Sequence, residues 1–202
     1  MEITSIKQQI KNAGRYSIFV DARYAFSLSA DALIESGLTQ GRELSRDELA
    51  AYKKASQEDK AYNLTLAYVA RRMRSEGELY EYFRRRQYAD ELIVIIMNKL
   101  RKLGFVDDAE FARRWVENRR LLKSASSKKL RLELRQKRVS DEIIQATLSA
   151  DENDELELLR DLTIKKRKQS RYQDDQKLIA YLARQGFNYS DIKIVLGKEN
   201  SY

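Results

Sequence analysis

The chain has 202 residues, of which 43% are hydrophobic and 35% charged, so it is too apolar for a disordered protein and too polar for a membrane protein. It contains no cysteine and no histidine, which excludes disulfides, Ser-His-Asp triads and zinc sites built on those ligands. The net charge of +8 lies in the middle of the chain, because residues 58–105 carry 10 bases and 7 acids, and residues 106–149 carry 11 and 7. A basic middle indicates a polyanion or an acidic protein surface as partner, although a solvated helical surface would have the same composition.

The first 29 residues alternate between polar and apolar side chains, which is typical of β-strands. In each of three sets the residues are separated by an even number of positions and so would lie on one face of a strand: Thr4, Ile6 and Ile10; Tyr16, Ile18 and Val20; Tyr24, Phe26 and Leu28. Asn12-Ala13-Gly14 and Asp21-Ala22-Arg23 have the composition of turns. We predict a small antiparallel β-meander of three strands, followed by short helices near Asp31–Ser36 and Ser45–Ser56.

From about Glu58 the apolar residues follow helical spacing. Ser75-Glu76-Gly77-Glu78 has the spacing of a capping box at a helix start. Asp90 opens the next helix, whose centre, Leu92–Met97, is apolar nearly all round and predicts a buried helix. Gly104 is placed to end that helix.

A set of five apolar positions recurs three times, with spacings of 4, 5, 5 and 4 residues. The sets are Leu79, Phe83, Tyr88, Ile93 and Met97; Leu130, Leu134, Val139, Ile144 and Leu148; and Leu178, Leu182, Phe187, Ile192 and Leu196. Each set follows a further helix, expected at Asp59–Arg72, Asp107–Leu122 and Asp154–Lys168. The pattern predicts a mainly α protein in which the N-terminal β-meander is followed in the sequence by a tandem array of three repeats, each of three helices. We expect the domains to span residues 1–57, 58–105, 106–149 and 150–202.

Basic residues supply the candidate binding site. The helix expected near Ser127–Arg138 carries Lys128, Arg131, Arg135 and Arg138 within an arc of about 80°, and no acid of that helix falls inside the arc. Such a stripe can follow phosphates or a groove lined with carboxylates. The loop before the capping box adds Arg71, Arg72 and Arg74. An ordinary solvated helix face is the alternative interpretation.

Other conspicuous residues have simpler structural explanations. Asp107-Asp108 could contribute to a metal site, but Asp107 is better explained as an N-cap, with Glu110 three residues later. Trp115 could stack on a base, but its spacing from Phe111 favours core packing. The runs Arg84–Arg86 and Lys165–Lys168 lie near expected helix C-termini, where cations are favourable. The sequence predicts no metal, no cofactor and no phosphate-binding loop.

Three motifs make the chain resemble the RecX family, regulators of the bacterial RecA recombinase. They are Arg72-x-Arg74-Ser75-Glu76-x-Glu78-Leu79, Gly104-Phe105-Val106-Asp107-Asp108-x-x-Phe111-Ala112 and Leu130-x-x-Glu133-Leu134-x-x-Lys137. The resemblance covers the chain from about Glu58 onwards, and the N-terminal meander looks like an extension carried by some members. Many members have glycine where this chain has Ser126 and Arg138, and the third repeat is more divergent and less basic.

The resemblance implies a non-catalytic regulator that binds RecA and its filament on single-stranded DNA, inhibits ATP hydrolysis and recombination, and so acts in DNA repair and the SOS response. Duplex DNA is a further candidate partner. Leu92–Met97 is too short to span a membrane, and the first residues do not resemble a signal peptide, so we expect a cytoplasmic protein. We also expect the chain to be a monomer. The alternatives are a helical-repeat protein that binds duplex DNA without RecA, and a scaffold for an unrelated protein.

Overall fold

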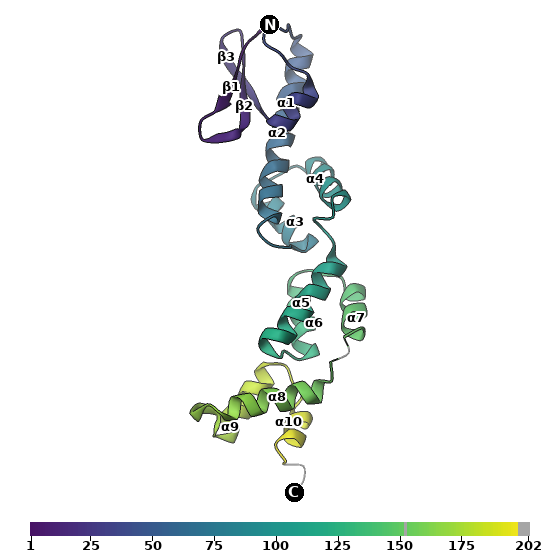
Figure 1. Cartoon of the computed structure of the whole chain (residues 1–202). Coiled ribbons are helices and arrows are strands. Elements are labelled where there is room, and N and C mark those ends of the chain that lie inside the picture. The colour runs from purple at the N-terminus through teal and green to yellow at the C-terminus, as the bar shows by residue number, and fades with distance from the viewer. Residues whose placement is uncertain (152, 198–202) are drawn as a thin grey trace. The chain divides into compact units, whose positions relative to one another are not determined.

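The computed structural model describes residues 1–151 and 153–197 of the chain (Figure 1). Over these residues the chain is mainly helical, with a small antiparallel sheet at its N-terminal end, as the sequence predicts. The chain forms two compact units. The first comprises Met1–Arg72 and Tyr88–Phe105, and the second comprises Met73–Gln87 and the described residues from Val106 onwards.

The first unit begins with a three-stranded sheet in the order β1-β2-β3, formed by β1 (Ile3–Gln9), β2 (Asn12–Val20) and β3 (Arg23–Ser29). Both neighbouring pairs are antiparallel. The sequence predicts the first turn at Asn12-Ala13-Gly14, but this prediction is wrong: Asn12 pairs with Gln9, so the turn is tighter and lies at Ile10 and Lys11. Ile10, expected to be a strand residue, is therefore fully exposed.

One face of the sheet is covered by α1 (Ala30–Ser36) and α2 (Arg46–Val69). The core of this part combines apolar side chains of the strands with two leucines that follow α1: Ile3, Ile18, Val20, Phe26, Leu28, Leu38 and Leu44. Tyr52 of α2 stacks on Phe26 of β3, with ring centroids 5.8 Å apart. The alternation of strand residues thus places one apolar face of the sheet against the helices.

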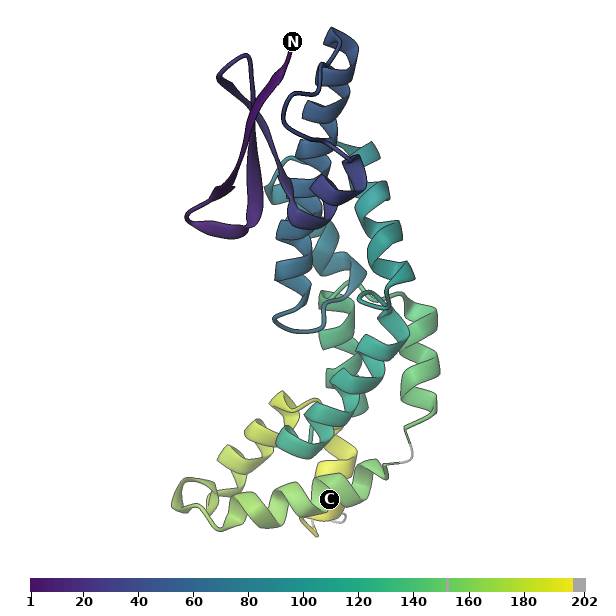
Figure 2. The same cartoon turned by 45° about the horizontal axis from the view of Figure 1, so that its top comes forward.

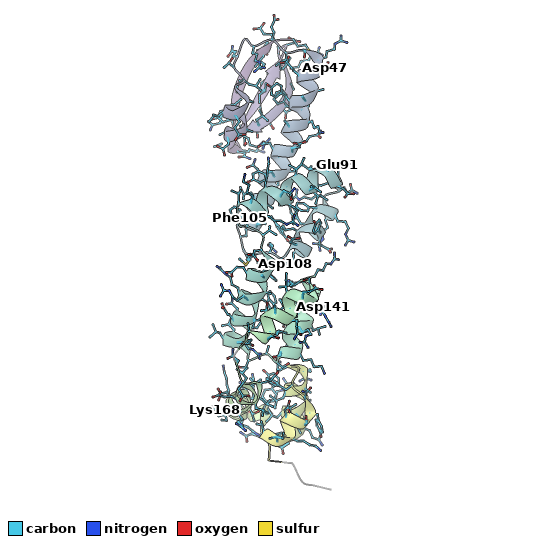
Figure 3. All side chains as sticks on the ribbon, turned by 90° about the vertical axis from the view of Figure 1, so that its right-hand side faces the viewer. Asp47, Glu91, Phe105, Asp108, Asp141 and Lys168 are labelled. Atoms are coloured by element: carbon cyan, nitrogen blue, oxygen red, sulfur yellow. The ribbon has the colours of Figure 1, made fainter. Side chains whose placement is uncertain are left out.

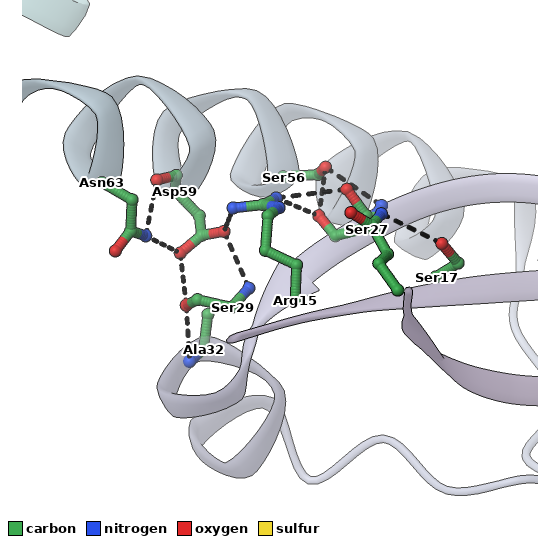
Figure 4. A network of polar contacts seen from close by, with 9 residues as sticks. Arg15, Ser17, Ser27, Ser29, Ala32, Ser56, Asp59 and Asn63 are labelled. Atoms are coloured by element: carbon green, nitrogen blue, oxygen red, sulfur yellow. Dashed lines mark hydrogen bonds and ion pairs between the residues drawn. The ribbon is translucent and has the colours of Figure 1, made fainter. Parts of the chain in front are cut away.

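A polar network fastens α2 to the sheet (Figure 4). Arg15 of β2 is buried and donates to Asp59 Oδ2 at 2.7 Å and to the carbonyl of Ser27 at 2.9 Å. Asp59 also accepts from the backbone N–H of Ser29, at 2.9 Å. Ser56 donates its hydroxyl to the Ser27 carbonyl at 2.6 Å. Because the buried charges are paired and hydrogen-bonded, the network fixes one register of α2 on the strands.

α2 corrects a prediction. The sequence suggests separate helices at Ser45–Ser56 and Asp59–Arg72, whereas one helix of 24 residues runs through both. No glycine or proline lies between the two segments, and the polar residues Ser56 and Asp59 bond to the sheet instead of ending the helix. The expected boundary after residue 57 therefore falls inside a continuous helix.

α4 (Asp90–Lys102) completes the first unit. Ile93, Ile96 and Met97 are buried, but Val94 is 58% exposed. The prediction of a helix buried all round is therefore wrong, because one face of α4 meets solvent. Gly104 ends the helix as predicted: its φ is +73°, and the backbone N–H of Phe105 donates back to the carbonyl of Leu100 at 3.0 Å.

The second unit contains the remaining helices: α3 (Glu76–Arg85), α5 (Asp108–Lys123), α6 (Ser127–Gln136), α7 (Asp141–Ser149), α8 (Glu155–Arg167), the 3-10 helix η1 (Ser170–Tyr172), α9 (Asp175–Arg184) and α10 (Tyr189–Val195). A serine or aspartate side chain caps most of these helices, as in Ser75 before α3 and Asp154 before α8. In each of the three sets of repeated apolar positions, four of the five side chains are buried. The second and third sets each belong to one hydrophobic core, as the repeat predicts, whereas the residues of the first set divide between the two units.

Within the second unit, the start of α3 packs against the turn between α6 and α7. Ser75 donates its hydroxyl to the carbonyl of Lys137 at 2.6 Å, and Lys137 Nζ donates to Glu78 Oε1 at 2.7 Å. A Cβ on Gly77 would lie 2.3 Å from the Cβ of Arg138, so this close approach requires glycine. We call this contact the first junction.

A second junction repeats the arrangement one repeat further on, where the start of α6 packs against the turn between α9 and α10. Ser126 donates its backbone N–H to the Gln185 carbonyl at 3.3 Å, and Lys129 Nζ donates to Gln185 Oε1 at 2.7 Å. Here the glycine lies in the turn, since a Cβ on Gly186 would be 2.3 Å from Ser126 Oγ. Each junction thus has one glycine at its closest point, on the helix in one and in the turn in the other.

Candidate functional site

The predicted basic stripe lies on α6 and the turn after it. Lys128 and Arg135 are exposed and Arg131 is half-exposed on the helix. Arg138 is exposed but does not belong to α6, which ends at Gln136. Its φ of +58° places it in the left-handed region that favours glycine. The structure therefore brings three of the four residues together on one helix and holds the fourth in the turn of the first junction.

Acids from other helices meet the stripe. Arg135 Nε donates to Asp141 Oδ1 at 2.8 Å, at the start of α7, and Arg138 Nη2 donates to Glu81 Oε2 of α3 at 3.1 Å. Asp141 is labelled in Figure 3. Arg131 donates to the side-chain oxygen of Gln145 at 3.3 Å. The stripe is free of acids only within its own helix, so the expectation of an acid-free face is wrong in three dimensions.

These ion pairs set the protonation of the groups around the stripe. The hydrogen bond from Arg135 lowers the pKa of Asp141, and the charges of Arg135 and Arg131 act in the same direction. Asp141 in turn raises the pKa of Arg135. The raised pKa of Arg135 and the lowered pKa of Asp141 both favour the charged pair, so Arg135 can exchange one oxyanion partner for another at neutral pH.

The three arginines before the capping box divide between the two units. Arg71 and Arg72 are exposed and follow α2 in the first unit, whereas Arg74 is half-buried in the second. Arg74 directly precedes Ser75, which bonds to Lys137. Arg74 therefore lies at the first junction, near the end of the stripe that carries Arg138.

The acidic pair acts in helix capping. Asp107 accepts from the backbone N–H of Glu110 at 3.0 Å, which confirms the predicted N-cap. Asp108 accepts from the backbone N–H of Glu76 at 2.8 Å and so satisfies the first turn of α3 as well. No group of three or more acidic side chains is placed to hold a metal ion among the residues that the structure describes.

Trp115 packs as predicted, beside the core of the second repeat. Its ring stacks on Phe111 with centroids 5.7 Å apart, and its indole N–H donates to Glu133 Oε2 at 2.9 Å. Arg119 and Lys137 lie over the ring at 4.5 and 5.2 Å. Because cations and core side chains already occupy its surroundings, Trp115 is not an open platform for a base.

A groove of about 700 Å³ on the first unit is lined by residues of α1, α2 and α4. α4 runs beside α2 (Figure 2). Asp31, Glu35 and Glu58 contribute acids to it, while Lys99 and Lys102 contribute bases. Asp59, which also lines the groove, is already paired with Arg15 in the network that fixes α2. The groove offers charges for a partner, but its chemistry lacks an activated nucleophile with a base beside it.

A third group of cations lies around two tyrosines in the third repeat, and only one of its members, Lys166, belongs to the run Lys165–Lys168 predicted at a helix C-terminus. Lys166 of α8 lies over Tyr172 at 5.6 Å and over Tyr181 at 4.8 Å, and the two rings are 5.0 Å apart. On α9, Lys177 and Arg184 flank Tyr181 at positions four before and three after it. We call Lys166, Arg171, Tyr172, Lys177, Tyr181 and Arg184 the tyrosine patch. Only the helical spacing of Lys177, Tyr181 and Arg184 could have signalled it in the sequence.

The fold and these surfaces define a class of protein in which a small β-domain is followed along the chain by tandem three-helix repeats. In the part of the chain that the structure describes, no helix is long and apolar enough to cross a membrane. Models of one family match the whole arrangement in order: the regulatory protein RecX N-terminal domain at residues 1–45, and the first, second and third RecX three-helix domains at residues 61–100, 107–148 and 153–196. The chain belongs to the RecX family of regulatory proteins.

Curated relatives agree with this assignment. A regulatory protein RecX from Bacillus velezensis is 31% identical over 96% of this chain and 76% of its own length. Relatives of the same description from Lactobacillus johnsonii and Bacillus subtilis are 31% and 29% identical, over 92% and 96% of this chain and over 70% and 75% of their own lengths.

Two solved structures are similar. A crystal structure of regulatory protein RecX is 29% identical and superposes with a TM-score of 0.71 over 97% of this chain and 98% of that chain. RecX from Lactobacillus salivarius superposes with a TM-score of 0.59 over 71% of this chain and 97% of its own, at 23% identity, which supports the fold alone.

Proposed function

We propose that this chain is a non-catalytic, cytoplasmic and monomeric regulator that binds RecA and the RecA filament on single-stranded DNA, inhibits its ATPase and recombinase activities, and so modulates DNA repair and recombination. The observation that carries the proposal is the ordered match of four RecX family domains along the chain. Tandem repeats with an excess of positive charge in the middle of the chain suit an elongated, negatively charged partner.

The contact surface for this partner consists of the basic residues identified above: Arg71, Arg72, Arg74, Lys128, Arg131, Arg135 and Arg138. The exposed ion pairs of Arg135 and Arg138 support the role, because a guanidinium that already binds one carboxylate can bind a phosphate or a partner carboxylate in the same geometry. The proposal keeps residues 1–57, 58–105, 106–149 and 150–202 as divisions of the sequence, of which the first ends within α2 and is joined to the second by that helix.

The test is the ATPase rate of RecA on single-stranded DNA while the chain is titrated, with binding to free single-stranded and duplex DNA measured in parallel at two salt concentrations. Inhibition at amounts too small to coat the DNA is expected, because a regulator of the filament acts on the protein lattice. No inhibition at a severalfold molar excess over RecA would refute the proposal. Sequence-preferring duplex binding without inhibition would instead support a DNA-binding protein that acts without RecA.

A further inference from the structure

The groove on the first unit has a floor that follows one face of α2. The α2 residues that line it recur at helical spacing and include Tyr52, Ala55, Asp59 and Tyr62. From Tyr52 to Tyr62 the helix rises about 15 Å, so the floor is about three turns long. Ala55 is exposed within this floor, and its small side chain leaves space above it. The groove is therefore long and open, which suits a segment of polypeptide better than an enclosed small molecule.

The polar network of Figure 4 holds α1 and α2 together at one end of this groove. Ser29, the N-cap of α1, donates its hydroxyl to Asp59 Oδ1 at 2.5 Å and accepts from the backbone N–H of Ala32 at 3.3 Å. Asn63 of α2 donates to the same carboxylate oxygen at 2.8 Å. The first turn of α1 is thus fixed to α2, so the groove is present before a partner binds. A preformed groove lowers the ordering cost of binding.

Unpaired charges of opposite sign line the groove from different helices. Asp31 and Glu35 lie one turn apart on α1 and are both exposed, and Glu58 of α2 adds a third acid to the lining. Lys99 and Lys102 lie one turn apart on α4 and are also exposed. Over the described residues, none of these five side chains takes part in an ion pair. A partner therefore meets the acids of α1 and the lysines of α4 without first displacing an ion pair of the chain.

Apolar surface lies between these charges. Leu103, just after α4, is 58% exposed, and Tyr62 is half-buried under Lys99, whose Nζ lies 5.3 Å from the ring centroid. Ala32 and Ala55 add small apolar side chains from α1 and α2. Apolar surface flanked by charges is typical of helix-in-groove recognition, in which an amphipathic helix lays its apolar face into the groove.

Other kinds of occupant do not fit this groove. The phosphates of a nucleic acid would meet the carboxylates of α1, which carry the same charge. A partner strand cannot simply add to the edge of β3, because the backbone N–H groups of Ser27 and Ser29 already donate to Ser56 Oγ and to Asp59 Oδ2, at 3.3 and 2.9 Å. A protein helix is therefore the occupant that the charges and the covered sheet edge favour.

We propose that this groove is a docking site for a helical segment of RecA, about three turns long to match the groove floor. The inference rests on the proposed function, which supplies the partner, and adds the site and the chemistry of the segment. The segment carries lysine or arginine on the flank that faces α1, and aspartate or glutamate on the flank that faces α4. Small or apolar residues lie on the face that contacts α2. Complementary charges on the two flanks fix the orientation of the bound helix.

The experiment measures the affinity of the full-length chain for RecA assembled on oligo(dT) with a non-hydrolysable ATP analogue, and for free oligo(dT), by biolayer interferometry. Asp31→Asn with Glu35→Gln removes two negative charges, which strengthens binding to a polyanion. Docking in the groove predicts the opposite for the filament, where binding weakens at least ~5-fold because two exposed ion pairs are lost. Lys99→Gln with Lys102→Gln is expected to weaken filament binding by a similar factor, for the same reason.

A steric variant tests the groove without a change of charge. Ala55→Trp fills part of the floor and is expected to weaken filament binding at least ~10-fold, because the indole occupies the space of the docked helix. Ala51→Trp, at an exposed position of α2 outside the lining, is expected to bind like the parent chain. The matched charge control is Asp47→Asn with Glu91→Gln, since both acids lie in the first turn of a helix and outside the lining (Figure 3). Circular dichroism verifies that each variant is folded.

The outcomes separate this inference from the proposed function. If the groove and control variants bind the filament equally while the parent chain inhibits RecA, the site is overturned and the regulatory function stands. A parent chain that neither binds the filament nor inhibits RecA refutes both. Stronger binding of Asp31→Asn with Glu35→Gln to filament and oligo(dT) alike would assign the groove to nucleic acid. A dimer of the parent chain in light scattering that Ala55→Trp abolishes would assign it to a second copy, and either result overturns the inference.

Discussion

Asp151 is a buried carboxylate held by a buried arginine. Arg120 Nε donates to Asp151 Oδ2 at 2.8 Å, and both side chains are less than 10% exposed. The other guanidinium nitrogens donate to the carbonyl of Ala125 and to Ser127 Oγ, so the whole fork is satisfied. The pair ties α5 to the segment that leads into the third repeat.

The first prediction concerns the pH dependence of this pair. Burial alone would raise the pKa of Asp151, but hydrogen bonds from Asn153 and Arg120 and the charge of Arg120 outweigh it, so the pKa is lowered on folding. A lowered folded pKa means that the stabilisation is complete above the unfolded value, near 4, and is lost as pH falls through the folded value. We expect Asp151→Asn to lower the free energy of unfolding at pH 7 by about 3 kcal/mol and to abolish this acid-dependent loss.

Urea denaturation of the parent chain and of Asp151→Asn checks the prediction. It is measured at several pH values between about 3 and about 7, a range that includes the ordinary carboxyl pKa of about 4. Asp141→Asn is the matched control, because its side chain is 67% exposed in its pair with Arg135. The control is expected to unfold at nearly the parent midpoint. Parallel pH profiles for the parent chain and Asp151→Asn would show that the pair does not stabilise the fold.

The second prediction at the residue scale concerns the stripe. Arg131→Gln with Arg135→Gln is expected to raise the concentration of the chain needed to inhibit RecA at least ~10-fold, if each arginine contributes a charge-assisted contact of about 1.5 kcal/mol or more. Arg113→Gln with Arg114→Gln has the same charge change on α5 and is expected to inhibit like the parent chain. Equal inhibition by the two double variants would remove the stripe from the contact surface.

The stripe also shows what a sequence can say about a binding surface. Lys128, Arg131 and Arg135 lie on one helix face because helical periodicity fixes their angles, and the sequence predicts this correctly. Asp141, the partner of Arg135, and Glu81, the partner of Arg138, lie on other helices, so their distance from the stripe depends on how the helices pack. Arg138 leaves the face because the chain turns at positive φ after α6. Arginine rarely adopts this conformation, so the sequence gives no signal of the turn.

At the scale of the helices, predictions hold where the signal is local and fail where tertiary contacts decide. Gly104 ends α4 through its own backbone freedom, and the prediction is confirmed. The expected break near residue 57 is absent, because the sheet satisfies Ser56 and Asp59 within a continuous α2. The tyrosine patch escaped notice because its members come from α8, η1 and α9, and only packing brings them together.

The third prediction compares two glycines with the same backbone role. Gly104 and Gly186 both follow a helix at positive φ, +73° and +92°, so alanine at either costs about 1–2 kcal/mol of backbone strain. A Cβ on Gly104 meets nothing within 4 Å, whereas a Cβ on Gly186 would lie 2.3 Å from Ser126 Oγ and 3.0 Å from the backbone nitrogen of Lys129. We expect Gly186→Ala to lower the unfolding free energy by at least about 1 kcal/mol more than Gly104→Ala, because overpacking adds to the strain.

Thermal and urea unfolding of the two variants measures this difference. Equal destabilisation of the two variants would mean that the second junction accommodates the added methyl group with no further loss of unfolding free energy. Greater loss in Gly104→Ala would contradict the close approach at Gly186 altogether.

At the scale of the whole molecule, the junctions explain how one repeat is coupled to the next. Both use the start of the second helix of one repeat and the turn between the second and third helices of the following repeat. In repeat proteins stability is the sum of the repeats and the interfaces between neighbours, so a disturbed interface affects the repeats that share it. The two junctions share the second repeat, which lies between them in the chain.

The last prediction concerns Gly77, at the closest point of the first junction. Alanine at Gly77 would place its Cβ 2.3 Å from the Cβ of Arg138 and 2.8 Å from the carbonyl of Lys137, so the start of α3 must move away from the turn between α6 and α7. Movement breaks the bond from Ser75 to Lys137 and exposes both sides of the first junction. We expect Gly77→Ala to speed amide hydrogen exchange in the first turn of α3 and around residues 137–139, and to leave α8, α9 and α10 unchanged.

Hydrogen exchange followed by mass spectrometry distinguishes this result from general destabilisation. Gly186→Ala is the reciprocal variant, because it disturbs the second junction and should speed exchange at the start of α6 and in the turn between α9 and α10 while α3 keeps its protection. Native-state exchange resolves such local opening below the free energy of global unfolding. If either variant instead accelerates exchange uniformly across the second unit, the repeats unfold as one cooperative body and the junctions are not separable interfaces.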